Sequence, residues 1–196
     1  MDETKTPPTP VETPEVPAAI TDPRIQPANP GMGTIADLLV KNKVKVTDRD
    51  KTEFFKCFLA DKPYEEEFKL FNDEFKVTFR SLSVGENNDV FKQVIYDQQQ
   101  GVPKTDEAYF VTLVTYRAAT TISKLQGEPF QPELTRDNFK EDKEKGLTYV
   151  RARAAIFDTW PAFKLQALLE AFRVFELKVV HLTEQVTDPN FWKPEK

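Results

Sequence analysis

The chain has 196 residues and a net charge of −5 at pH 7, a length that accommodates one domain or two small ones. It has no clustered basic excess, so we expect no nucleic-acid partner. One cysteine, Cys57, and one histidine, His181, exclude an internal disulfide, a Cys/His metal cluster and a proton relay between histidines. There is neither a run of about eighteen apolar residues nor a secretory signal, so no membrane partner and a cytoplasmic location are expected.

Residues 1–33 differ in composition from the rest of the chain, because eight of the fifteen prolines lie within the first thirty residues. Each proline fixes its own φ and pushes the preceding residue into an extended conformation. With few large apolar side chains, such a segment cannot offset the entropy of its own ordering. We therefore predict a disordered Pro-rich arm over 1–33, a helical domain over 34–187 and an aromatic tail over 188–196.

Three capping boxes predict helix starts in this domain. Thr34, Thr47 and Ser83 each precede an acidic residue by three positions, so a hydroxyl and a carboxylate can satisfy amides of the first helical turn. The apolar spacing predicts a further helix from about Thr105 to about Leu125, and another from about 147 to 160.

Residues 64–82 alternate between apolar and polar side chains and predict a β-hairpin around an Asn72–Asp73 turn. All its apolar residues then share one face, which a helix or another chain must cover. Both outer edges of the hairpin are expected to stay open for strand addition. The predicted register pairs Glu65 with Arg80, Phe68 with Val77 and Leu70 with Phe75.

The last helix is predicted to begin at Pro161 and to carry a heptad-like apolar seam over 165–186. Its other faces also hold apolar residues, so part of its covering is expected to come from another subunit. After it, Phe191 and Trp192 form a tail that either docks into a partner's pocket or packs on its own domain. Together these elements predict an α+β fold that is predominantly α-helical, with one antiparallel hairpin.

Few residues indicate catalytic chemistry. We expect His181 to be a packing residue and Cys57 to lie in the core, because both stand among apolar neighbours. Glu74 and Lys76 flank Phe75 as in nucleases that hold a divalent metal beside a lysine, but the upstream Pro-Asp pair is missing, so a solvated face is expected. No glycine-rich phosphate loop occurs. We expect no metal, no cofactor and no enzymatic activity.

The layout of the central segment resembles a known group of proteins. A helix that ends in F-L-A-D-K-P-Y, an E-E-E-F-K-L-F / E-F-K-V-T-F-R-S-L hairpin, a Ser-capped helix and the closing D-P-N-F-W-K-P are similar to small tail-assembly and baseplate-assembly proteins of tailed bacteriophages. The resemblance covers about residues 50–125 and the tail. It implies a non-enzymatic chaperone that shields a tail component, or alternatively a subunit that stays in the virion tail or baseplate.

These observations favour an assembly protein that binds other phage tail or baseplate proteins in the host cytoplasm, with retention in the virion and homo-oligomerisation left open. A metal-dependent nuclease ranks third, and a helical adaptor unrelated to phage also remains. The sixteen phenylalanines indicate extensive contacts, since aromatic area dominates both cores and interfaces. The expected contact residues are Phe75, Val77, Phe79, Leu165, Phe172, Phe175, Phe191 and Trp192.

Overall fold

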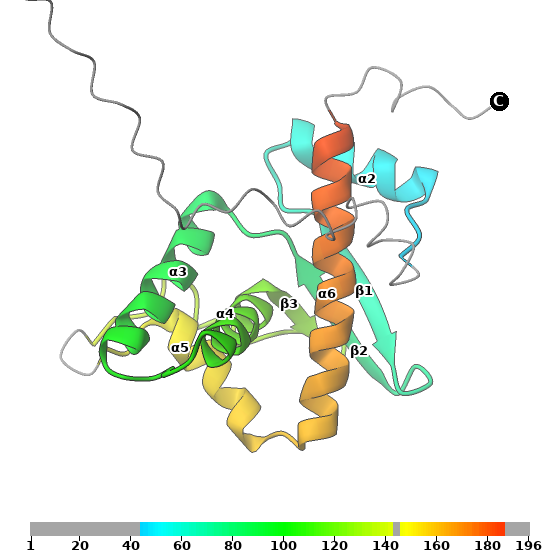
Figure 1. Cartoon of the computed structure of the whole chain (residues 1–196). Helices are drawn as coiled ribbons and strands as arrows, with labels where there is room; N and C mark the ends of the chain where they lie inside the picture. Colours follow the sequence, from blue (N-terminus) through cyan, green and yellow to red (C-terminus); the bar gives the residue numbers. More distant parts are fainter. Residues whose placement is uncertain (1–43, 143–145, 187–196) are drawn as a thin grey trace, which may run out of the picture. The chain divides into compact units, whose positions relative to one another are not determined.

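The computed structural model describes residues 44–142 and 146–186, all within the larger of the two units into which the chain divides, Thr34–Lys196 (Figure 1). This part has an α+β fold that is predominantly α-helical, as predicted. In chain order the elements are α2 (Asp48–Leu59), β1 (Glu65–Leu70), β2 (Phe75–Arg80), α3 (Val84–Gln99), α4 (Asp106–Thr121), β3 (Ile122–Leu125), β4 (Glu128–Pro129), α5 (Tyr149–Ala154), the 3-10 helix η1 (Ala155–Thr159) and α6 (Ala162–Gln185). The predicted arm, the helix start at Thr34 and the aromatic tail lie outside the described residues.

Local hydrogen bonds set the helix starts where the sequence predicts them. The Thr47 and Ser83 hydroxyls accept from the amides of Asp50 and Glu86, and both acidic side chains bond back to the cap. Thr105 caps α4 in the same way, with its hydroxyl accepting from the Ala108 amide. Each such cap contributes about 1 kcal/mol to helix stability.

The hairpin has the predicted register, with Glu65 opposite Arg80, Phe68 opposite Val77 and Leu70 opposite Phe75. Its turn is longer than the predicted pair of residues, because the strands stop at Leu70 and Phe75. Phe71, Asn72 and Asp73 all have positive φ, a conformation that Asn and Asp tolerate better than Phe. The tight connection therefore holds Phe71 in the turn instead of in β1.

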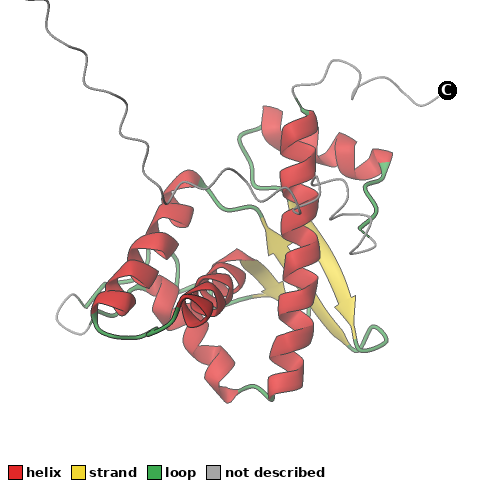
Figure 2. Cartoon of the chain, in the orientation of Figure 1, coloured by secondary structure: helices red, strands yellow, loops and turns green. Residues whose placement is uncertain are grey.

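The hairpin belongs to an antiparallel sheet of four strands in the order β1-β2-β3-β4, whose strands are yellow in Figure 2. Because β2 also pairs with β3, the expectation that both outer edges of the hairpin stay open is wrong. The predicted helix over 105–125 ends at Thr121, and Ile122–Leu125 pairs with β2 as β3. Ile122 is fully buried in the sheet. Because β3 pairs with β2, only the β1 side of the hairpin lacks a neighbouring strand among the described residues.

Helix α6 crosses one face of the sheet and forms the core with it (Figure 1). Phe175 lies 5.7 Å from Phe79 and 6.3 Å from Phe68, measured between ring centres, and Phe172 lies 5.7 Å from Phe79. The seam of α6 thus covers the chain's own hairpin. Its other faces are only partly covered, and Val180 is 42% exposed.

Helices α3, α4 and α5 join through a buried polar network. Asp97, which is 7% exposed, accepts 2.8 and 2.6 Å hydrogen bonds from Gln93 Nε2 and the Tyr116 hydroxyl. Thr148, the N-cap of α5, donates to Gln93 Oε1 over 2.5 Å. Because each buried polar group has a partner, the network fixes these helices instead of destabilising them.

Across 44–142 and 146–186, we find no helix that combines the length and apolar character needed to span a bilayer.

Candidate functional site

The structure places most of the predicted contact residues inside the domain. The hairpin and α6 face each other, so their apolar sides satisfy one another and a partner cannot reach them in this state. Leu165 is half-buried at the same interface, while Phe191 and Trp192 lie outside the described residues. The buried side chains, each at most 8% exposed, are Phe75, Val77, Phe79, Phe172 and Phe175.

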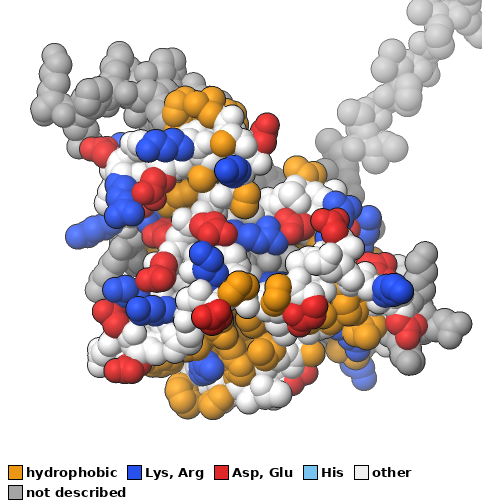
Figure 3. Space-filling model, turned by 180° about the vertical axis from the view of Figure 1, so that it is seen from behind, with side chains coloured by type: hydrophobic (Ala, Val, Ile, Leu, Met, Phe, Trp, Pro, Cys, Tyr) orange, Lys and Arg blue, Asp and Glu red, His pale blue; other side chains and the backbone are white. Residues whose placement is uncertain are grey.

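Other large apolar side chains are exposed instead, and eight of the eleven among the described residues gather at three places. On the face shown in Figure 3, hydrophobic side chains form patches between charged ones. One group lies at the hairpin tip and the start of α6, a second around the start of α4, and a third between the end of α2 and the start of α3. The members are Phe71 and Phe163; Val102, Phe110 and Val111; and Phe58, Leu59 and Val84.

The group at the hairpin tip is an aromatic pair. Phe71 and Phe163 are 44% and 67% exposed, and their ring centres lie 6.1 Å apart in an edge-to-face arrangement. Phe71 is held by the positive-φ turn, and Phe163 stands in the first turn of α6. Near the start of the same helix, Lys164 Nζ lies 3.9 Å from the centre of the Trp160 ring in a cation–π contact. We call Phe71 and Phe163 the aromatic pair.

The β1 edge ends beside this pair. β1 is the terminal strand of the sheet, and no other described strand pairs with its outer side. Its exposed side chains, Glu65, Glu67 and Lys69, face away from the core. Glu66 on the opposite face accepts a 2.6 Å hydrogen bond from Lys178. An edge with unpaired backbone groups and outward charges can accept an extended peptide while resisting indiscriminate pairing.

Lys178 anchors β1 and α2 to α6. It is 6% exposed, and its Nζ lies 2.6 Å from Glu66 and 3.3 Å from Asp50. Burial alone would raise the pKa of Asp50, but hydrogen bonds from Thr47 and the charge of Lys178 hold it below its usual value. Burial and the neighbouring Glu66 raise the pKa of the Tyr64 hydroxyl, which joins the same cluster. These charges are structural ties behind the β1 edge.

A groove of about 380 Å³ separates α3 from α6. Apolar side chains form much of its lining, among them Leu82, Val84, Phe91, Val179 and Val180. We call it the α3–α6 groove. A second hollow of about 540 Å³, which Phe58 and Cys57 line, adjoins it across the segment 80–84.

Two arginines also line the α3–α6 groove. Arg80 pairs with Glu86 through bonds of 3.0 and 2.5 Å, and these bonds hold the pKa of Glu86 below its usual value although burial opposes them. Arg117 lies 2.6 Å from Glu176, whose pKa burial raises. The Arg117 Nε is buried and has no hydrogen-bond partner. The groove therefore combines apolar walls with two guanidinium groups.

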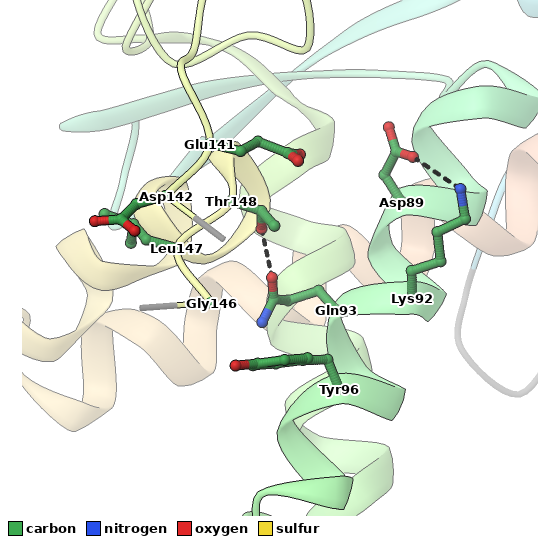
Figure 4. Close-up of a pocket in the computed structure, with 9 residues that line it drawn as sticks. All are labelled: Asp89, Lys92, Gln93, Tyr96, Glu141, Asp142, Gly146, Leu147 and Thr148. Atoms are coloured by element: carbon green, nitrogen blue, oxygen red, sulfur yellow. Dashed lines mark hydrogen bonds and ion pairs between the residues drawn. The ribbon is translucent and has the colours of Figure 1, made fainter. Parts of the chain in front are cut away.

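A pocket of about 390 Å³, lined by several polar and charged residues, lies between α3 and the loop before α5 (Figure 4). Asp89 and Lys92 lie side by side on α3, Thr148 points to Gln93, and the ring of Tyr96 lies against Gly146. Asp89 already binds Arg136 at 3.0 Å and Lys92 at 3.8 Å. Its carboxylate is therefore committed to structural contacts, and within the described ranges no group of three or more potential metal ligands is found.

The candidate catalytic residues of the sequence are not brought together. His181 is half-buried on α6, and burial lowers its pKa. Cys57 is half-buried and lines the hollow beside α2, so it lies at the rim of the core instead of within it. Glu74 and Lys76 are both exposed, at the turn and on the solvent face of β2.

Comparisons with protein-family models, with curated proteins and with solved structures give no match. Sequence reasoning missed the aromatic pair, because Phe71 falls on the polar side of the alternation of β1, outside its apolar face, and Phe163 precedes the seam of α6. The signal available was their position: each stands at the end of an element, where the core no longer extends.

Proposed function

We propose that this chain is a non-enzymatic assembly protein that binds an extended segment of a partner protein along the β1 edge, with the aromatic pair as its apolar anchor. The observation that carries the proposal is the aromatic pair, two exposed Phe rings in contact next to a strand edge. Exposed aromatic clusters on an otherwise well-packed domain are typical of protein interaction sites. The resemblance to phage tail-assembly proteins supports a tail or baseplate component as the partner.

The chemistry of the edge suggests the partner's composition. Glu65 and Glu67 are exposed on β1, so a basic extended segment complements them. Added strand pairing supplies backbone hydrogen bonds, each worth about 0.5–1.5 kcal/mol net. Because salt screens the attraction between Glu65, Glu67 and a basic partner, the association should weaken as the salt concentration rises.

The small size of this surface favours reversible binding. Two aromatic anchors and a six-residue edge must overcome the entropy lost on association, which leaves an affinity on the order of micromolar. Release of the partner is then easy. Reversible shielding suits a chaperone, whereas a retained subunit requires further contacts.

A photo-crosslinking amino acid at position 163 tests the proposed surface in the native source. The matched control places the same group at Phe110, which is 62% exposed against 67% for Phe163 but belongs to a different patch. We expect a defined partner crosslinked from position 163 and not from 110. Equal products from both positions, or none from 163, would refute the proposed surface, and a crosslinked homodimer would identify self-association instead.

Quantitative mass spectrometry of gradient-purified particles beside the crude lysate separates the two assembly roles. A chaperone of the host cytoplasm is abundant in the lysate and missing from the particle. A structural subunit of the tail or baseplate is present in the particle at constant stoichiometry. If the source yields no particle, the phage role fails, while the crosslinking result still tests the partner-binding surface.

A further inference from the structure

The α3–α6 groove lies apart from the aromatic pair, and the function proposed above does not use it. It is lined by the second half of α6, including Val179 and Val180, and by the start of α3, where Val84 is 80% exposed. A large apolar residue exposed to that extent at the rim of an apolar hollow indicates a surface that is covered by something else.

The chain itself continues from the same end of the domain. Helix α6 ends at Gln185, beside α2 (Figure 1), and Val179 and Val180 near that end line the groove together with the start of α3. From Val186, five residues lead to Phe191, and an extended chain of that length spans up to about 17 Å. Val180 lies six helical residues before Val186, a distance of about 9 Å along the helix axis. The segment after α6 is therefore long enough to turn back and reach the groove.

The chemistry of the segment matches the lining. Phe191 and Trp192 are adjacent aromatic residues, and the groove offers apolar walls together with the guanidinium groups of Arg80 and Arg117. Aromatic rings pack favourably on arginine planes as well as on aliphatic side chains. The volume of about 380 Å³ falls in the range of pockets that hold a bulky group.

We propose that the α3–α6 groove is the docking site of the Phe191–Trp192 tail of the same chain. The tail covers Val84 and Val180 and ties the end of α6 to the start of α3. This is an intramolecular contact, so its occupancy does not depend on protein concentration. It is also independent of the β1 edge, and either proposal can fail without the other.

Fluorescence of Trp192 tests the docking directly. The chain has two tryptophans, so a Trp160→Phe background leaves Trp192 as the only indole. We expect emission at a shorter wavelength than in the urea-unfolded chain, with protection from acrylamide quenching. Val84→Asp should release the tail, because it places a charge at the rim of the groove. Position 84 is in the first turn of α3, where an acidic residue is favourable, so the substitution preserves folding.

The expected release is about a tenfold fall in the ratio of docked to free tail, equivalent to about 1.4 kcal/mol. The matched control is Val111→Asp, a 58% exposed valine in a different patch, which should leave Trp192 unchanged. Emission already typical of the unfolded chain, or an equal response to both substitutions, would overturn the proposal. Protection that grows with protein concentration would also overturn it, in favour of the tail of a second copy.

A second measurement avoids the Trp160 background, since Trp160 packs on Phe75 and Phe157. Hydrogen exchange of the segment 80–84 is compared between the natural chain and a Phe191→Ala/Trp192→Ala variant. Faster exchange confined to this segment and the facing part of α6 supports docking. Identical exchange in the two proteins refutes it.

Discussion

Arg153 on α5 is a buried cation, and its replacement by methionine should destabilise the domain severely. The residue is 5% exposed, and its guanidinium donates only to backbone carbonyl oxygens, at distances of 2.5–3.3 Å. These bonds join the end of α4, the start of β3 and the loop that follows β4. The acceptors belong to Ala119, Ile122, Phe130, Gln131 and Leu134.

The magnitude follows from two opposing contributions. Three of the acceptor carbonyls belong to the buried residues Ala119, Ile122 and Phe130, and leaving each unsatisfied costs about 2 kcal/mol. Against this, burial lowers the pKa of Arg153 from its ordinary value to about 10, so removing the buried charge recovers about 3 kcal/mol. The expected net loss is about 3 kcal/mol, a large part of the ~5–15 kcal/mol that holds a domain folded.

Urea unfolding followed by circular dichroism measures this loss. The matched control is Arg151→Met, two residues away on α5, whose side chain is 48% exposed and whose nearest carboxylate, on Asp97, lies 3.8 Å away. We expect the midpoint of Arg153→Met to fall strongly at an unchanged m value, and that of Arg151→Met to change by less than about 0.5 kcal/mol. A loss below about 1 kcal/mol at Arg153, or equal losses in the two variants, would refute the role assigned to its carbonyl bonds.

Three further predictions concern other contacts. Gly146→Ala should lower the stability of the domain by about 2 kcal/mol more than Gly101→Ala, measured by thermal unfolding. Both glycines have positive φ, but only at Gly146 would an added Cβ overlap the ring of Tyr96. Equal losses of stability in the two variants would contradict this. Lys178→Met should cost about 3 kcal/mol in urea unfolding, because it leaves two partly buried carboxylates without their cation; an unchanged midpoint would contradict this. Burial raises the pKa of Tyr149 above its ordinary value of 10. The contribution of this hydroxyl to the free energy of unfolding is therefore complete below pH 10. It is lost as pH rises above 10, by up to about 1.4 kcal/mol per pH unit. The Tyr149→Phe variant should lose less stability between pH 9.5 and 11 than the natural chain, and parallel curves would contradict the assignment.

Local interactions explain the parts of the fold that were predicted correctly. The caps at Thr47, Ser83 and Thr105 depend on groups within three residues, so the sequence contains both partners. The hairpin register depends on alternation around a single turn, and moving it by one residue would expose the whole apolar face. Both features were therefore predictable.

The end of α4 was not predictable from spacing. Ile122 and Leu125 are three residues apart and fit an apolar helix face, and a four-residue strand is too short to show its own period. The chain leaves the helix there because Ile122 gains a buried place beside β2, more than forty residues earlier in sequence. Only the folded sheet contains that partner.

The candidate site shows the same division between local and tertiary information. The residue pattern alone requires that the hairpin and the last helix each have an apolar face that is covered, since exposed apolar area of that extent is unfavourable. Tertiary structure decided that the two faces cover each other, which buried Phe79 and Phe175 and left Phe71 and Phe163 exposed. The physical reason is that hydrophobic burial has no direction along the chain: a pattern specifies that a surface is covered, and only the packing of distant segments specifies by which one.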